Sequence, residues 1–383
     1  MRSQYYIEQL LFKVINRLSR FLLVTTSLVL ISSCGSPSAN LPASNTNTAV
    51  SSATNTNNNL TNVNVQLSFL FQSLDAPLVL AINNGYFAAE GLNVTYERGF
   101  GNVDTISKLG AGAFNIAFSD IYNTLEFNDK NPNDKIIAVA VPFNRAPFAV
   151  LSLDPAIASP QNLAGRTLGA PAGDGPRKLF PLFAKETGVD PNSVTWTTME
   201  PRLRETFLLQ GKVDAISAFS TSALPSLLRG GKSMEDINVF YYNDFGLDFY
   251  GNAILAKESF VQQNPEVVRG FVRAYLRGMQ DMLRDPNAAL DAVIAADQSK
   301  LMDREAEQVR LQVALNDLII TLEAESLGLG AVDPQRLQTS ITQTVAGFGL
   351  NSQPTVADIF TDEFLPVKEE RALPPQNERQ PLS

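Results

Sequence analysis

Two patterns of hydrophobic and polar positions take turns along most of the chain. Short apolar or alternating runs, such as residues 63–69 and 167–170, have the length and spacing of strands. Each run is followed by a turn rich in Gly, Pro, Ser or Asp, and then by apolar residues at helical spacing. Strands that alternate with helices predict a mainly parallel sheet with helices on both faces.

The strand–turn–helix pattern occurs four times, in two pairs. The first pair covers residues 93–109 and 112–125, and the second covers residues 165–183 and 211–227. Ligands of such sheets bind beyond the carboxyl ends of the strands. Two pairs therefore predict two lobes that face each other across a cleft.

The glycine-rich turn at residues 171–176 is the most distinctive of these connections. Gly173 and Gly175 allow the backbone to approach a ligand closely, and Pro176 suits the first position of a helix. The turn lacks the Gly-Lys-Ser/Thr ending of a phosphate-binding loop. It is either a ligand loop or an ordinary strand-to-helix turn.

Length and composition narrow the classes of function. A chain of 383 residues with 44% hydrophobic residues predicts two domains with full cores. A net charge of −9 argues against a nucleic-acid partner. The chain has no histidine and one cysteine, Cys34, which excludes histidine-based acid/base catalysis, His/Cys zinc sites and internal disulfides. We expect neither a metal nor a cofactor.

Residues 1–33 have the pattern of an export signal. Lys13, Arg17 and Arg20 precede an apolar run at 21–31, which is shorter than the roughly 20 residues of a membrane-spanning helix. Ile-Ser-Ser-Cys-Gly at 31–35 resembles a bacterial lipoprotein signal, which would place a lipid on Cys34. The alternative is an ordinary signal peptide with a chance cysteine. Residues 34–62 are mostly Ser, Asn, Thr, Ala and Pro and predict a flexible, lipidated tether.

Five sequence motifs follow one another in an order typical of one protein family. They are GYFAAEGLNV at 85–94, KLGAGAFNIAF at 108–118, SPQNLAGRTLGAP at 159–171, LQGKVDA at 209–215 and NPEVVRGFVRAYLRGM at 264–279. Over residues 63–285 the chain resembles the solute-binding proteins of ABC importers of the nitrate, sulfonate, taurine and thiamine-pyrimidine type.

This resemblance implies a two-lobed α/β fold of the periplasmic-binding-protein type (type II), with parallel-rich sheets, a hinge and an interlobe cleft. The apolar runs at 148–153 and 251–256 suit the two crossings between lobes. We expect lobe 1 at 63–147 and 249–383, and lobe 2 at 148–248. The C-terminal helices would cover lobe 1, and the Pro-rich tail from Pro374 would fray.

The implied function is capture of a small organic solute and its delivery to an ABC permease. We expect a monomer that is exported and lipid-anchored, in the periplasm or on the outer face of the cytoplasmic membrane, and not an enzyme. Fungal thiamine-pyrimidine synthases share this fold but consume their own histidine, which this chain lacks. Alternatives of another class are a ligand-sensing lipoprotein, or a cleft hydrolase with a carboxylate pair such as Asp120 and Asp174, two groups that are more simply explained as cleft lining.

Candidate solute contacts lie at strand ends and helix starts, where polar residues are joined by aromatic residues able to stack on a flat ring. Asp120 is the foremost candidate because it ends an apolar strand, whereas Asp75 and Asp174 could simply cap helices. Carboxylates and aromatic rings outnumber arginines in this set, which favours a pyrimidine or flavin-like heterocycle over a sulfonate, taurine or nitrate anion. The candidates are Phe71, Gln72, Ser73, Asp75, Ser119, Asp120, Tyr122, Phe148, Asp174, Arg177, Phe219, Ser220, Thr221 and Tyr250.

Overall fold

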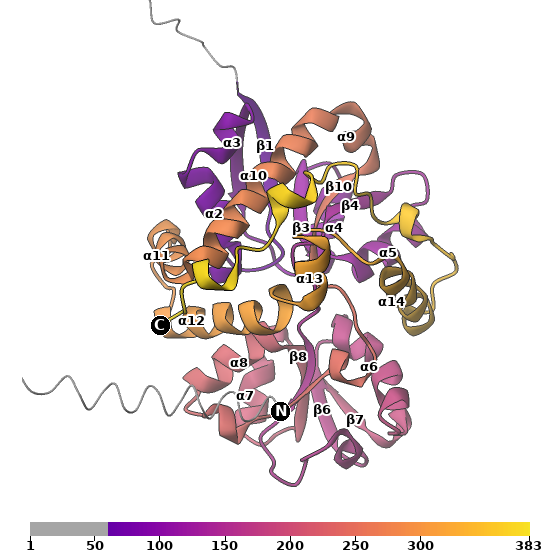
Figure 1. Ribbon diagram of the computed structural model, residues 1–383. Helices are drawn as coiled ribbons and strands as arrows, with labels where there is room; N and C mark the ends of the chain where they lie inside the picture. The colour runs from indigo at the N-terminus through magenta and orange to yellow at the C-terminus, as the bar shows by residue number, and fades with distance from the viewer. Residues whose placement is uncertain (1–59) are drawn as a thin grey trace, which may run out of the picture. The chain divides into compact units, whose positions relative to one another are not determined.

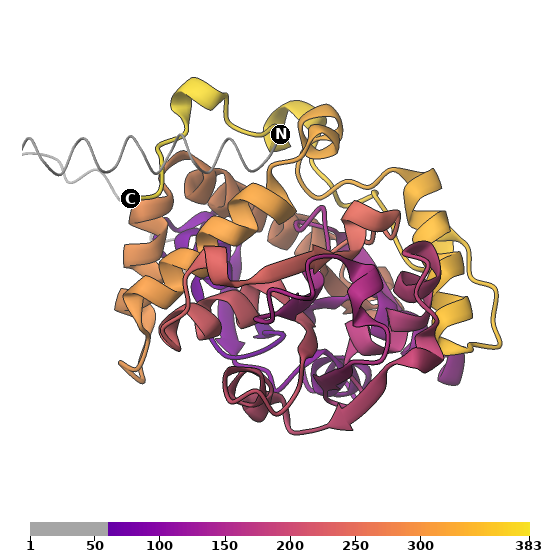
Figure 2. The ribbon, with the colours of Figure 1, turned by 90° about the horizontal axis from the view of Figure 1, so that it is seen from below.

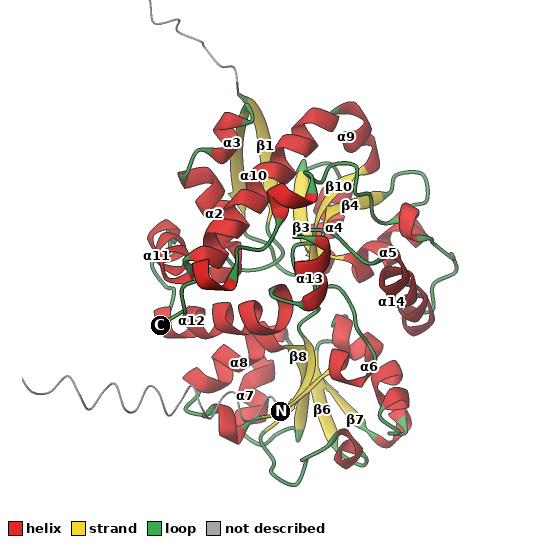
Figure 3. Ribbon diagram, in the orientation of Figure 1, coloured by secondary structure: helices red, strands yellow, loops and turns green. Residues whose placement is uncertain are grey.

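The computed structural model describes residues 60–383, so the expected signal peptide, Cys34 and nearly all of the tether lie outside the described residues. The described part contains two five-stranded sheets with helices packed around them (Figures 1 and 3). None of its helices has the length and apolar character needed to cross a membrane.

The first sheet has the strand order β2-β1-β3-β10-β4. β1 runs parallel to β2 and β3, and β10 runs antiparallel between β3 and β4. Its strands are β1 (Thr61–Gln66), β2 (Leu92–Glu97), β3 (Ile116–Asp120), β4 (Ile136–Ala140) and β10 (Asn252–Lys257). The helices of this part of the chain are α2 (Ala76–Asn83), α3 (Tyr86–Ala89), α4 (Asn102–Gly110), α5 (Ile121–Lys130), α9 (Glu258–Gln263) and α10 (Pro265–Arg284).

The second sheet has the corresponding order β7-β6-β8-β5-β9. β6 is parallel to β7 and β8, and β5 is antiparallel to β8 and β9. Its strands are β5 (Phe148–Ser152), β6 (Thr167–Ala170), β7 (Thr195–Thr198), β8 (Ala215–Phe219) and β9 (Asn238–Tyr241). The connecting helices are α6 (Gly175–Glu186), α7 (Arg204–Leu209) and α8 (Ser220–Arg229). The predicted strands, turns and helices of all four units are therefore present.

The chain passes between the sheets at residues 141–147 and again at residues 242–251. The strands that begin after these crossings, β5 and β10, are the antiparallel members of their sheets. Both apolar runs predicted at the crossings are thus strands. The placement of the domain boundaries around them stays a prediction.

Helix α10 provides much of the core beside the first sheet. The apolar stripe predicted from its sequence is buried, with Phe271 and Met279 fully inaccessible. The helix packs closely against α2, because a Cβ on Gly278 would lie only 2.1 Å from the carbonyl oxygen of Pro77. Glycine at this position therefore sets the distance between the two helices.

The C-terminal helices contact elements of both sheets. They are α11 (Pro286–Ala296), α12 (Arg304–Val313), α13 (Leu322–Leu327) and α14 (Pro334–Phe348), and α11 and α14 lie on opposite sides in Figures 1 and 2. α12 packs on α8 of the second sheet and on the turn η1 (Ser73–Asp75) of the first. It does so because Leu311 joins the core beside the first sheet while Val313 joins a core cluster of the second.

The Pro-rich tail is ordered against the body rather than frayed. Leu373 and Leu382 are buried in the core beside α10. The tail is also fixed by hydrogen bonds from the Asn287 side-chain amide to the Pro381 carbonyl (2.9 Å) and from the Gln380 amide to the Arg284 carbonyl (2.8 Å). The proline content of the tail, on which the prediction relied, gave no indication that Leu373 and Leu382 would be buried.

Candidate solute-binding site

A pocket of about 330 Å³ lies between the strand ends of the two sheets. Its volume is at the lower end of the range for small-molecule sites. Every parallel strand contributes through the residues that follow its carboxyl end, which is where ligands bind in such sheets. The lining includes Ser68, Phe69, Gln72, Leu74, Phe100, Gly101, Asn102, Val103, Asp104, Asn123, Phe143, Pro147, Pro171, Gly173, Asp174, Gly175, Pro201, Arg204, Phe219, Thr221, Ser222, Asn252 and Leu318.

Aromatic rings supply much of the apolar wall. Phe219 stacks on Phe148, with ring centroids 5.4 Å apart and an interplanar angle of 15°. Phe69 and Phe100 remain 39% and 63% exposed, and the Arg98 and Lys108 cations lie 4.3 and 5.0 Å from the centroid of the Phe100 ring. These rings could stack on a flat solute.

The glycine loop after β2 positions the two exposed rings. The amides of Gly99 and Gly101 donate to the carbonyls of Phe69 and Ser68 at 2.8 and 2.9 Å. A Cβ on Gly99 would lie 2.1 Å from the carbonyl oxygen of Leu67, so only glycine allows this contact. The loop is therefore held against the residues that follow β1, and both contribute to the same wall.

Asp174 and Arg204 form a buried charged corner on the side of the second sheet. The Asp174 carboxylate caps α6 through the Arg177 amide at 3.4 Å, accepts from the Ser217 hydroxyl at 3.4 Å and lies 3.8 Å from the Arg204 guanidinium. Burial raises the pKa of Asp174 to about 6, and Arg204 opposes this shift. Arg204 also donates twice to one oxygen of Glu205, at 2.9 and 2.7 Å, so its charge is compensated.

Asp120 ends β3 as predicted, but it does not line the pocket. Its carboxylate caps α5, accepting from the Asn123 amide (2.7 Å), the Asn123 side chain (2.8 Å) and the Asn102 side chain. Burial raises the pKa of Asp120, and the hydrogen bonds from Asn123 oppose that rise. Asp120 therefore positions Asn102 and Asn123, which do line the pocket.

Asn123 presents an unused acceptor at the pocket wall. Because its side-chain nitrogen donates to the Asp120 carboxylate, its Oδ1 must face elsewhere. That oxygen is buried and has no hydrogen-bond partner among residues 60–383.

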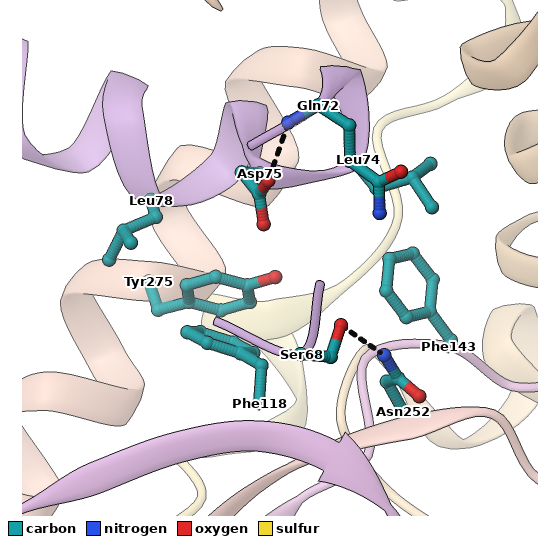
Figure 4. A pocket seen from close by; sticks show the side chains of 9 residues that line it. All are labelled: Ser68, Gln72, Leu74, Asp75, Leu78, Phe118, Phe143, Asn252 and Tyr275. Carbon is teal, nitrogen blue, oxygen red and sulfur yellow. Dashed lines mark hydrogen bonds between the residues drawn. The ribbon is translucent and has the colours of Figure 1, made fainter. Parts of the chain in front are cut away.

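A smaller cavity of about 20 Å³ adjoins the main pocket on the side of the first sheet (Figure 4). Asp75 faces it from η1, where its Oδ2 accepts from the Gln72 amide at 2.9 Å in a capping box. Burial raises the pKa of Asp75 to about 7. The two cavities share lining residues, namely Ser68, Gln72, Leu74, Phe143 and Asn252.

A chain of polar contacts connects the two sides of the pocket through α12. The amide and hydroxyl of Ser73 donate to Glu307, at 2.7 and 2.9 Å, and Glu307 pairs with Arg310 at 3.1 Å. Arg310 in turn donates to the Thr221 carbonyl at the start of α8. We call this set, Ser73, Glu307, Arg310 and Thr221, the α12 bridge.

The structure brings together only some of the residues predicted for the site. Gln72, Asp174, Phe219 and Thr221 line the main pocket, and Asp75 joins Gln72 at the smaller cavity. For these five residues, contact with a solute stays a prediction.

The other predicted residues line neither cavity, and their surroundings explain why. Tyr122 is buried and donates to the Tyr250 carbonyl at 2.6 Å, while the Tyr250 hydroxyl turns away to Glu323. Arg177 lies over Trp196 at 4.7 Å. Phe71 stacks on Tyr96, and Phe148 lies behind Phe219. Ser73 belongs to the α12 bridge, and Asp120 caps α5. Ser119 and Ser220 are fully buried. Since Asp120 is enclosed in its cap, it does not form a carboxylate pair with Asp174 in the pocket.

Several lining residues escaped the sequence analysis. Phe100 sits between Gly99 and Gly101 in the turn of the first strand–turn–helix unit, and that position was an available signal. No sequence signal marked Arg204 or Asn123, because the role of Arg204 depends on the turn before α7 and that of Asn123 on the Asp120 cap. No cluster of His, Cys, Asp or Glu that could hold a metal ion occurs within residues 60–383.

Comparison with solved structures defines the class of this protein. The periplasmic nitrate-binding protein NrtA from Synechocystis PCC 6803 superposes with a TM-score of 0.62 at 12% identity, covering 84% of this chain and 91% of NrtA. At this identity the likeness establishes the fold, which is the two-lobed α/β fold of periplasmic binding proteins, as predicted.

Sequence comparison establishes the family. The family model described as NMT1/THI5 like matches residues 73–289, and the chain belongs to this family. The chain is 29% identical to the riboflavin-binding protein RibY of Chloroflexus aurantiacus over 344 residues, covering 88% of this chain and 95% of RibY. It is 27% identical to the formylaminopyrimidine-binding protein of Halalkalibacterium halodurans over 266 residues, covering 68% and 78%. The predicted family resemblance is confirmed, and both relatives are binding proteins.

Proposed function

We propose that this protein is the solute-binding component of an ABC importer and that its solute is a heterocycle of the flavin or aminopyrimidine class. The observation that carries the proposal is the main pocket, which combines aromatic walls with polar groups at strand ends of both sheets. The names of the two relatives, which bind riboflavin and formylaminopyrimidine, agree with it.

The chemistry of the wall favours a flat, uncharged or cationic ring. Phe69 and Phe219 offer faces for stacking, and Asn102 and Asn123 bring side-chain amides to the same pocket. An anion would need either a cation that is not already paired or several free N–H donors. Among the described residues that line the pocket, Arg204 is the one cation, and Glu205 and Asp174 compensate it. A sulfonate or nitrate would therefore bind less well.

Capture and release depend on the two sides of the pocket moving about the crossings at 141–147 and 242–251. A solute that contacts both sides stabilises the closed arrangement, because those contacts exist only when the sides meet. The closed protein then docks on its permease. We propose no chemical step, so the solute leaves unchanged.

Titration with defined probes tests this proposal. Riboflavin binding is followed by its fluorescence, and formylaminopyrimidine, taurine and nitrate are titrated by calorimetry. We expect saturable, one-to-one binding of riboflavin or formylaminopyrimidine, and much weaker binding of both anions. Tight binding of taurine or nitrate, without binding of either heterocycle, would contradict the proposal.

We also propose that the protein is exported and held at the membrane by a lipid on Cys34, which lies outside the described residues. The motif at residues 31–35 supports this proposal. Replacing Cys34 with Ser should leave an uncleaved or freely soluble protein. Unchanged extraction with the membrane fraction in that variant would contradict lipid attachment.

A further inference from the structure

The small cavity beside the main pocket has the size of one chemical group. Its volume of about 20 Å³ exceeds the ~10–15 Å³ that a single water requires, but it is far too small for a ring. It shares five lining residues with the main pocket, so a group that enters it belongs to a molecule whose bulk lies in the main pocket.

Two polar groups face this cavity without a partner. Figure 4 shows the Asp75 carboxyl and the Tyr275 hydroxyl pointing into the same space. One Asp75 oxygen accepts from the Gln72 amide, and the side chains of Asp75 and Tyr275 make no other hydrogen bond within residues 60–383. Tyr275 is only 2% exposed. Asp75 is partly buried, and a polar group without a partner is costly at the depth of Tyr275, so a complementary group is expected there.

The neighbouring charges do not neutralise Asp75. The groups that face it are Tyr96, Tyr275, Glu307 and Arg310. Arg310 is the one cation in this set, and it is taken up by Glu307 at 3.1 Å and by a backbone carbonyl in the α12 bridge. Glu307 adds a second negative charge. A group that donates a hydrogen bond to Asp75 therefore finds an acceptor that no side chain of the described region satisfies.

We propose that this cavity is a subsite for one terminal hydrogen-bond donor of the solute, a hydroxyl or an amino group, while the ring of the solute occupies the main pocket. Asp75 accepts the hydrogen bond, and Tyr275 completes the contact. The inference rests on the proposed function, because it requires the ring to lie in the main pocket. For a flavin the donor is a hydroxyl of the ribityl chain, and for an aminopyrimidine it is an amino group.

The test compares probes that share a ring and either carry or lack the donor-bearing substituent. Riboflavin is compared with lumiflavin, which carries a methyl group in place of the ribityl chain. If the protein prefers formylaminopyrimidine, that compound is compared with an analogue in which methyl replaces its amino group. Both pairs are titrated into the full-length wild type, Asp75→Asn and Tyr275→Phe.

A matched control separates solute binding from capping and from net charge. Asp236 occupies the same position of a capping box in the turn η5 (Met234–Asp236), where it accepts from the Ser233 amide at 2.7 Å far from either cavity. Asp236→Asn changes the charge and the cap as Asp75→Asn does. Lumiflavin affinity and thermal unfolding report whether each variant is folded.

We expect wild type to bind the donor-bearing probe roughly ten- to a hundredfold more tightly than its partner. Asp75→Asn should reduce that ratio to a few-fold, Tyr275→Phe should reduce it less, and Asp236→Asn should leave it unchanged. Equal ratios in wild type, Asp75→Asn and Tyr275→Phe would overturn the subsite while leaving the proposed function intact. Failure of the wild type to bind either ring would overturn the proposed function and the subsite together.

Discussion

Replacing Asp174 with Asn should stabilise the solute-free protein at pH 8. The native carboxylate is 11% exposed, and its contacts with Arg204, Ser217 and the α6 cap are all 3.4 Å or longer. These contacts do not offset the cost of burying the charge, which is why the pKa of Asp174 is raised to about 6. Asn keeps the cap and removes the charge.

The magnitude follows from the linkage between protonation and folding. Because the folded pKa lies above the unfolded value of about 3.9, the stability contributed by this group is fully present below pH ~4 and is lost as the pH rises to about 6. A pKa shift of about two units lowers the free energy of unfolding by at most ~3 kcal/mol at pH 8 and by ~1 kcal/mol at pH 4.5. The advantage of Asp174→Asn over wild type should shrink accordingly.

Urea unfolding between pH 4.5 and pH 8 measures this difference. Asp236→Asn is a control whose effect on stability should have the opposite sign, because hydrogen bonds from Ser233 lower the pKa of Asp236. Removing the Asp236 carboxylate should therefore destabilise the protein more at pH 8 than in acid. If Asp174→Asn were less stable than wild type at pH 8, or if its advantage did not depend on pH, the argument would be refuted. A variant that is more stable but binds solute less tightly would show that Asp174 is retained for binding.

Three other substitutions test the way the structure supports the pocket. Glu307→Gln should cost about 1–3 kcal/mol in thermal unfolding and weaken solute binding, because it leaves Arg310 without its partner in the α12 bridge. Asp120→Asn should lower the stability by about 1–3 kcal/mol and also lower the affinity for solute, because one amide oxygen cannot accept from three N–H donors. An unchanged melting temperature would contradict the role of Asp120 as a cap. Gly99→Ala should weaken binding in the same titration, because its new Cβ meets a carbonyl oxygen at 2.1 Å and pushes the loop away from the residues that follow β1.

The fold could be predicted because its signals are local and repeated. The change from strand to helical spacing places β3 and β8 along with the helices that follow them, and the family motifs occur in the expected order. Sequence position also showed correctly that Asp120 stands at a strand end.

The direction of each side chain could not be predicted in the same way. Asp120 and Phe219 both end strands, yet Asp120 turns into the cap of α5 while Phe219 faces the pocket. Arg204 enters the pocket from the first position of α7, where no motif marks it, and α12 crosses to the second sheet because two of its apolar residues serve different cores. These features depend on contacts between segments far apart in the chain, which periodicity does not encode.

The most direct test of the central claim is the identity of the molecule that the protein retains when it is purified without denaturation. Native mass spectrometry, followed by denaturation and analysis of the released compound, gives its stoichiometry and mass. We predict one equivalent of a flavin or aminopyrimidine per chain, released chemically unchanged. A retained sulfonate or nitrate, or a product altered by the protein, would contradict the account.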